Sequence, residues 1–302
     1  MTAILHSNLE TDLRLASSLA ANLRVLLADQ ASLRRSGAIT FLGSVNGALS
    51  DTLKERYAGL DGYDAFAATA AEDTDVSSTA LTDSSVSVAV ARHAIRRDIS
   101  DLAVLTGNGG ISAERLAASM AGEYEQLFNS LVCTAIAGFG TDVGTSGSDM
   151  TVSDFFSAMF QLELSNVPGP YTAILHPRQL ADMRESLRAE GGAVQFADAT
   201  MEMLAIKGQG YAGSYLGTDI YKISKVTSSG GNRNGGMFGA NCLGYRIGTI
   251  EQVIGSTLIR ADEYAVEFER DASKGITEVV GHAYVGVAVL EDARGVGIVT
   301  DA

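Results

Sequence analysis

Residues 112–137 read SAERLAASMAGEYEQLFNSLVCTAIA, the longest regular helical pattern in the chain. Apolar side chains recur in it at intervals of three and four residues, which places them on one broad face of a helix. Ser112 can cap the first turn, and Gly138 and Gly140 can end the last one. At ~1.5 Å per residue the stretch predicts a helix roughly 39 Å long, a spine on which other elements can pack.

The composition is that of a folded, acidic chain. Hydrophobic residues make up 46% of its 302 positions and charged residues 19%, which is typical of globular proteins. The formal net charge of −14 argues against broad adhesion to nucleic acid or to an anionic membrane. Neither a membrane helix nor a secretory signal is indicated, because charges such as Glu10 and Arg14 interrupt the apolar pattern of the first helix. We expect a soluble, cytoplasmic product of about two domains.

The two cysteines do not indicate a metal site, and one glycine pattern does not indicate a nucleotide-binding loop. Cys133 and Cys242 lie far apart and match no metal-ligand spacing, so we expect two reduced thiols, with Cys133 facing the core. Gly208, Gly210 and Gly213 have the spacing of a dinucleotide-binding loop. That motif needs a strand before it and a helix after it, whereas here a helical pattern precedes and a strand follows.

Two further features are candidate sites. The glycine-rich residues 228–241 lack the Lys-Ser/Thr pair of a phosphate-binding loop and are interpreted as a mobile loop. His176, before Pro177 at the end of a short strand, stands where a catalytic base could lie, but no nucleophile accompanies it and a structural role is favoured. We therefore predict no catalytic residue, no cofactor and no metal site.

Two segments suggest contacts beyond their own domain. Residues 8–29 repeat leucines on a helical period, and this amphipathic helix could pack on its own domain or dock on a neighbouring subunit. Residues 57–91 contain six acidic residues and no Lys or Arg. This acidic stretch could be a solvated surface loop or an extended hairpin that reaches onto another molecule.

A basic cluster follows the acidic stretch directly. Residues 86–90 alternate Val with Ser or Ala, which predicts a strand with one buried face. The alternation is expected to break at the densest group of basic side chains in the chain, Arg92, His93, Arg96 and Arg97.

Helices and short strands alternate between about residues 150 and 250, which indicates a separate α+β module inserted between two parts of another domain. Helices are expected at 149–164, 178–190 and 200–206, and strands at 172–175 and 219–226.

The last fifty residues predict a β-hairpin. Residues 264–268 alternate in polarity, 271–275 form a turn, and 276–290 resume as a long strand rich in Val and Gly. With the strand at 86–90, this hairpin can form a sheet that lies alongside the long helix and is assembled from both ends of the chain.

This order of parts resembles the major capsid protein of tailed bacteriophages, the Hong Kong 97-type fold. Local similarity lies in YTAILHPRQLADM (171–183), GMFGANCLGYRIG (236–248) and VEFERDASKGITEVVGHAYVGVAVLEDARGVGIV (266–299). The resemblance implies an α+β chain with an N-terminal arm at 1–42, an E-loop at 43–85, a peripheral domain at 86–150 and 251–302 that contains the spine helix 112–137, and an axial domain at 151–250.

The resemblance also implies a mechanical function. Copies of such a chain form pentamers and hexamers that close into an icosahedral shell around double-stranded DNA, as a virion capsid assembled in the cytoplasm of a bacterial host. The implied partners are further copies of the chain, DNA held without sequence specificity, and portal, scaffolding and decoration proteins, with no membrane. Some members cross-link neighbouring subunits through a lysine and an asparagine. The E-loop range here has no lysine after Lys54, so that chemistry is not carried over.

Within such a shell we predict that acids of the E-loop approach the basic cluster of a neighbouring subunit and set steering and register. The residues are Glu72, Asp73 and Asp75 on one subunit and Arg92, Arg96 and Arg97 on the other. Two other functions remain open: an encapsulin-like shell that houses a cargo enzyme, and a small cytosolic α+β enzyme with a site near His176 and the loop at 208–217.

Overall fold

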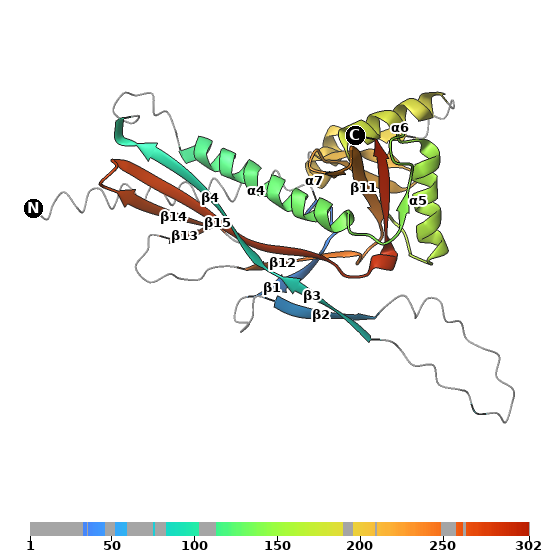
Figure 1. Cartoon of the computed structure of the whole chain (residues 1–302), viewed down its shortest axis with the longest axis horizontal. Helices are drawn as coiled ribbons and strands as arrows, with labels where there is room; N and C mark the ends of the chain where they lie inside the picture. Colours follow the sequence, from blue (N-terminus) through green and yellow to red (C-terminus); the bar gives the residue numbers. More distant parts are fainter. Residues whose placement is uncertain are drawn as a thin grey trace, which may run out of the picture.

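The structure is a computed structural model that describes residues 33–34, 36–45, 52–58, 75, 83–102, 113–189, 196–208, 210–248, 258–261 and 264–301. The strands of these residues form three sheets, and one long helix runs from the first sheet to the second (Figure 1). The helices are α4 (Ala113–Ile136), α5 (Val152–Leu164), α6 (Pro177–Ala189) and α7 (Met201–Lys207), with a 3₁₀ turn, η2, at Asp292–Arg294.

Helix α4 confirms the predicted spine. Its 24 residues span about 36 Å at 1.5 Å per residue. In its first half Met120 and Tyr124 pack into the core of the first sheet, and in its second half Phe128 and Ile136 pack into a core shared with the second sheet. One apolar face therefore joins both cores, because the helical period keeps it continuous. In the part of the chain that is described, no helix is long and apolar enough to cross a membrane.

The six-stranded first sheet lies alongside α4 (Figure 1). Its order is β1-β12-β15-β14-β13, and β4 also pairs with β15. The strands are β1 (Thr40–Ser44), β4 (Ala91–Ser100), β12 (Leu243–Gly248), β13 (Leu258–Ala261), β14 (Tyr264–Asp271) and β15 (Ile276–Val289). The predicted hairpin and its position against the long helix are confirmed. The expectation that the strand at 86–90 joins this sheet is wrong, because residues 83–89 pair with residues 52–58 in a separate two-stranded sheet and β4 takes the place beside β15.

The predicted break of the strand at the basic cluster is wrong. Strand β4 runs through Arg92 and Arg97 without interruption, because residues 91–100 each find a partner on β15. Ile95 and Ile99 pack against the core under α4 and keep the alternation of inward and outward residues. Arg92 and Arg96 occupy the outward positions and Arg97 lies on the side of α4, and none of them disturbs the backbone ladder.

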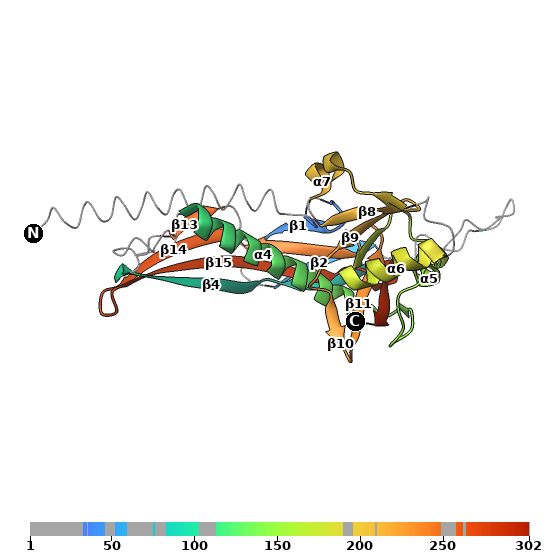
Figure 2. The ribbon, with the colours of Figure 1, turned by 90° about the horizontal axis from the view of Figure 1, so that it is seen from above.

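The eight-stranded second sheet has the order β5-β16-β11-β6-β9-β8-β7, with β10 paired to β11. Helices α5 and α6 cover one of its faces, and α7 lies on the other (Figure 2). The predicted helices and the strand at 172–175 are confirmed, whereas the strand predicted at 219–226 ends at Lys222. The strands are β5 (Asp142–Val143), β6 (Thr172–Leu175), β7 (Phe196–Asp198), β8 (Tyr211–Tyr215), β9 (Thr218–Lys222), β10 (Thr227–Ser229), β11 (Asn232–Phe238) and β16 (Gly295–Asp301).

The prediction of a mobile loop at 228–241 is wrong. This stretch forms β10 and β11, and β11 pairs with β16 on one side and β6 on the other. Its glycines serve close packing: a Cβ on Gly235 would lie 2.7 Å from Gln179 Oε1 on α6, and one on Gly236 would meet Ile136 of α4. The strand needs glycine because helices approach it from both faces.

The two large sheets exchange strands along the sequence. Strand β12, from within the range 151–250, pairs with β15 in the first sheet. Strand β16, from within the range 251–302, pairs with β11 in the second sheet. The division into a peripheral and an axial domain stays a prediction, and each of the two sheets contains a strand from the other range.

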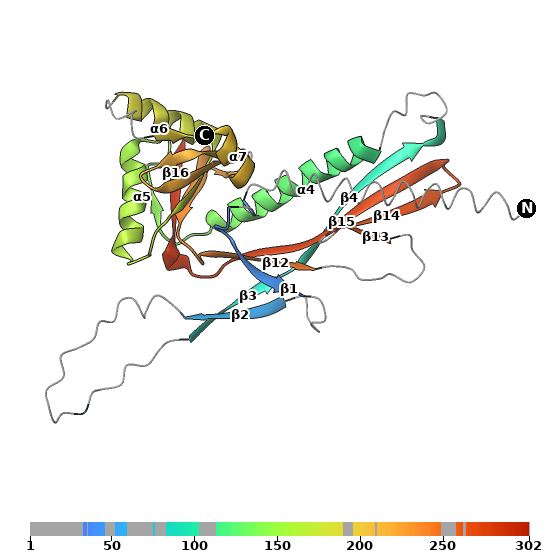
Figure 3. The same ribbon diagram turned by 180° about the vertical axis from the view of Figure 1, so that it is seen from behind.

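A two-stranded ribbon extends beyond β1 in the view from behind (Figure 3). It consists of β2 (Thr52–Ala58) and β3 (Asp83–Ala89), which pair antiparallel in continuous register. The ends of the acidic stretch are therefore joined as a hairpin. Residues 59–74 and 76–82, like the predicted helix at 8–29, lie outside the described residues, so what the middle of the stretch contacts remains a prediction.

Candidate subunit interfaces

The structure divides the predicted basic cluster between the two faces of the first sheet. Arg97 points to the side of α4, where it pairs with Glu123. Arg92 lies on the opposite face, because residues an odd number of positions apart on a strand point to opposite sides. There its Nη2 lies 3.2 Å from Nδ1 of the buried His282.

Arg96 shares the face of Arg92 and is held by two carboxylates of its own chain. Its Nε donates to Asp98 Oδ1 at 2.7 Å, and its Nη2 donates to Glu278 at 2.6 Å. The hydrogen bond between Arg96 and Asp98 raises the pKa of Arg96 and lowers the pKa of Asp98. Exposed pairs of this kind contribute little to stability, so the arginines can exchange these partners for others at small cost.

The acidic partners predicted for this cluster are described only in part. Asp75 is exposed, and Glu72 and Asp73 lie outside the described residues. A contact between these acids and the arginines of a neighbouring subunit therefore stays a prediction.

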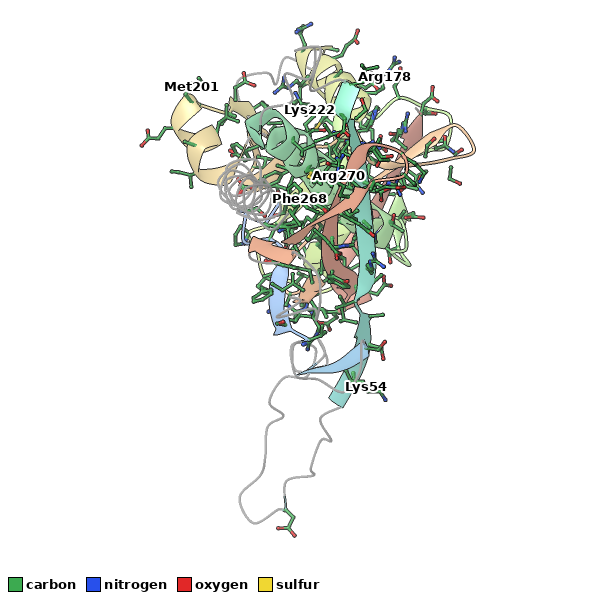
Figure 4. All side chains as sticks on the ribbon, turned by 90° about the vertical axis from the view of Figure 1, so that its left-hand side faces the viewer. Lys54, Arg178, Met201, Lys222, Phe268 and Arg270 are labelled. Carbon is green, nitrogen blue, oxygen red and sulfur yellow. The ribbon has the colours of Figure 1, made fainter. Side chains whose placement is uncertain are left out.

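A second group of charges lies where β4 and β14 end, and Figure 4 labels Arg270 of this group. Arg270 donates to both carboxylate oxygens of Asp101, at 2.8 and 2.6 Å, and so joins β14 to the end of β4. At the hairpin turn, Lys274 and Ser273 donate to Asp271 and lower the pKa of its carboxyl group. These hydrogen bonds stabilise the turn.

Helix α5 leaves an apolar stripe on the surface. Phe155 and Leu162 on its inward face are buried in the core of the second sheet. We name the exposed residues Phe156, Phe160 and Leu164, spaced one helical turn apart, the α5 stripe. Their four-residue spacing was the sequence signal that could have revealed it.

Helix α7 carries a second exposed apolar surface. Met201, Met203 and Ile206 are all exposed and are named the α7 patch. Leu204 contacts the core on the inward side of the helix. Large apolar side chains gathered at the surface are typical of protein contacts.

A groove of 810 Å³ runs along α6 and reaches Leu204 of α7. Its floor includes Leu180, Leu204 and Tyr211, and its charged lining residues are Arg184, Arg188, Lys222, Glu185 and Asp198. With three cations and two acids, the lining carries a small positive excess.

His176, the candidate base, belongs to the start of α6. Its Nδ1 accepts a hydrogen bond from the backbone N–H of Arg178 at 3.2 Å, and desolvation together with the charge of Arg233 lowers its pKa. Within the described residues no group of three or more His, Cys, Asp or Glu side chains could hold a metal ion. This geometry is that of a local cap at the helix start.

Both cysteines are buried, which confirms that Cys133 faces the core. Burial raises the pKa of the Cys133 thiol to about 12 and also raises that of Cys242. A protonated, buried thiol is a poor nucleophile.

The arrangement of two sheets on a long helix is the α+β fold of tailed-phage major capsid proteins, as the resemblance implied. The chain is similar to the capsid of Ralstonia phage GP4, with a TM-score of 0.63 and 13% identity over 91% of this chain and 92% of that chain. A structure from Mycobacterium phage Che8 gives a TM-score of 0.56 and 17% identity over 82% and 84%. The SrpI encapsulin from Synechococcus elongatus gives 0.59 and 12% over 83% and 81%. No family model and no curated protein matches the chain.

Proposed function

We propose that this chain is the structural subunit of an icosahedral shell that encloses double-stranded DNA. The observation that carries the proposal is the likeness to the GP4 capsid, which extends over 91% of this chain and 92% of that one, so that no large part is left for another task. The role is mechanical and not catalytic.

In this proposal each part of the chain has a task. The ribbon β2–β3 is the stem of an E-loop, the first sheet with α4 is the peripheral domain, and the second sheet with α5, α6 and α7 is the axial domain. Copies form pentamers and hexamers, and many modest interfaces act together because closure of the shell makes the later contacts effectively intramolecular.

The charge of the chain suits a container for DNA. With a net charge of −14, an acidic lining would not bind phosphate and would leave the packaged DNA free to enter and leave. The partners are then other copies of the chain, DNA without sequence preference, and portal, scaffolding and decoration proteins. The location is the virion capsid, after assembly in the host cytoplasm.

Electron microscopy of the expressed protein tests the proposal. We expect capsomers or closed particles under negative stain, and nuclease-protected DNA in particles purified from the infected host. A small discrete oligomer with no particles under any assembly condition would refute it and would favour the enzyme alternative near His176.

A second candidate is an encapsulin-like shell with a protein cargo, which the similarity to the SrpI encapsulin favours. Purified particles separate the two functions. A co-purified enzyme inside the particles and no protected DNA would establish the cargo shell.

The predicted contact between the acidic stretch and β4 is best tested at Arg92. Reversing the charge of Arg96 or Arg97 also breaks the pairs with Glu278 or Glu123, whereas Arg92 contacts a histidine ring. We expect Arg92→Glu to lower particle yield about tenfold, because like charges then face each other across the interface.

The compensating variant is Asp75→Lys, at an exposed position. Alone it should lower the yield to a similar degree, and combined with Arg92→Glu it should restore assembly. Circular dichroism of each unassembled variant verifies folding. If the double variant assembles as poorly as either single one, these two positions do not meet.

A further inference from the structure

A buried histidine joins three strands on the face of the first sheet that points away from α4. His282 of β15 is only 4% exposed, and its ring lies between Arg92 of β4 and Glu267 of β14. The Nη2 and Nε atoms of Arg92 lie 3.2 and 3.4 Å from Nδ1 of the ring. On the other side of the ring, a carboxylate oxygen of Glu267 lies 3.5 Å from Nε2. Each ring nitrogen therefore faces one charged group.

The strand register explains why the ring has these two neighbours. Strands β4, β15 and β14 lie side by side (Figure 1). Ala94 and Ala265 stand directly opposite His282 on the two flanking strands, and their methyl groups are too small to cover an imidazole. Arg92 and Glu267 occupy diagonal positions on the same face, from which long side chains reach the next strand. The two charged side chains therefore approach the ring from opposite sides.

The two neighbours determine which ring nitrogen carries the proton of the neutral histidine. A guanidinium group has only donors, so Nδ1 of His282 must accept from Arg92. An ionised carboxylate has only acceptors, so the ring proton belongs on Nε2, on the side of Glu267. A second proton can bind only at Nδ1, where the guanidinium lies. Protonation of the ring and its contact with Arg92 therefore exclude each other.

The charges around the ring determine which group moves when the ring is protonated. Glu267 stabilises a charged ring, whereas Arg92 repels it. Arg92 is also exposed and, among the residues that the structure describes, has no carboxylate partner, so it can move into water at small cost. The other ionisable residues of the strands around His282 on this face are Arg96 and Asp98 of β4, Glu278 and Tyr284 of β15, Glu269 of β14, Arg246 of β12, Arg260 of β13 by its register, and Asp83 at the start of β3. Arg96 is held by Asp98 and Glu278, so this pair of acids does not compensate a second cation at His282.

We propose that His282 is a proton-dependent switch for Arg92: the neutral ring holds the guanidinium on its own sheet, and the protonated ring releases it. Arg92 is the position at which we expect the acidic stretch of a neighbouring copy to bind, and this consequence rests on the proposed shell function. Histidines gain their proton between about pH 8 and pH 5, a range in which exposed carboxylates stay ionised. Acidification then makes Arg92 available to Asp75 of a neighbouring copy and strengthens the contact between copies.

Nitrogen NMR of the unassembled, isotope-labelled chain tests the switch. The ring signals of His282 report which nitrogen carries a proton, and the Nε signal of Arg92, identified by its loss in Arg92→Lys, reports the state of the guanidinium. We expect the proton on Nε2 at about pH 8, and a second proton on Nδ1 as the pH falls toward about 5, with the Arg92 signal moving at the same pH.

The matched variant is His282→Gln, whose neutral amide oxygen can still accept from Arg92 at every pH. Its Arg92 signal should not move over this range. The measurement on the parent chain needs no substitution, so it decides the matter even if the variant does not fold. A neutral ring with its proton on Nδ1, a ring that stays neutral down to about pH 5, or an Arg92 signal that does not follow the ring overturns the switch.

Particle yield separates the switch from the shell function. We expect the yield of the parent chain to rise several-fold on acidification and that of His282→Gln to change less. Particles without the coupled NMR signals overturn the switch and leave the shell in place. Coupled signals without particles under any assembly condition support the switch and overturn the shell. Coupled signals with the same pH response of yield in both chains overturn the role of Arg92 between copies.

Discussion

Replacing Phe128 by alanine should destabilise the unassembled subunit by about 3–5 kcal/mol. The Phe128 ring is fully buried in the middle of α4, where the helix passes from the first sheet to the second. It packs edge-on against Tyr245 at 5.3 Å between ring centroids, and the Arg34 guanidinium lies 4.4 Å from its centre. Truncation leaves a cavity in the core that the two sheets share, so packing contacts between the helix and this shared core are lost.

Urea denaturation followed by circular dichroism measures this effect at a concentration below that of assembly. The matched control is Phe160→Ala, the same change at an exposed site on α5, which should alter the free energy of unfolding by no more than about 0.5 kcal/mol. If the two variants lose the same free energy of unfolding, Phe128 does not stabilise the contact between the two sheets. A change in the slope of the transition, with a separate early step, would show that the two sheets unfold one after the other.

Replacing Gln179 by leucine should cost about 2–4 kcal/mol, because it leaves several buried backbone groups without partners. The fully buried amide connects α6 to the second sheet. Its Nε2 lies 3.1 Å from the Ile298 carbonyl oxygen and 2.9 Å from Thr300 Oγ1, and its Oε1 accepts from the His176 N–H at 3.0 Å. Leucine has a similar volume, so the loss is mainly that of hydrogen bonds.

Thermal and urea denaturation of Gln179→Leu can be compared with Gln161→Leu, a control on the partly exposed face of α5. The stability of the control should remain close to that of the parent protein, since a surface substitution usually changes the free energy of unfolding little. If Gln179→Leu is as stable as the control, the amide is not required to seat α6 on β11 and β16. Because Gln179 bonds to Ile298 and Thr300 of β16, loosening of this strand should appear as faster hydrogen exchange at residues 295–301.

Local sequence patterns were sufficient to predict the helices and strands whose apolar residues recur at a regular spacing. The helix at 113–136 follows from apolar residues three and four apart, and the hairpin of β14 and β15 follows from alternation on both sides of a turn. The helices at 149–164 and 178–190 were predicted in the same way. These features depend on neighbours within a few residues, so the sequence alone determines them.

Tertiary structure decided where distant segments meet. The sequence predicted a loop at 228–241 and a break after residue 90, and both became strands because β6, β15 and β16 supply backbone partners from far along the chain. The same long-range pairing placed β12 in one sheet and β16 in the other, and turned Arg92 and Arg97 to opposite faces. Periodicity shows which side of a strand is apolar, but the choice of a pairing partner depends on the packing energy of the whole chain, which no local window contains.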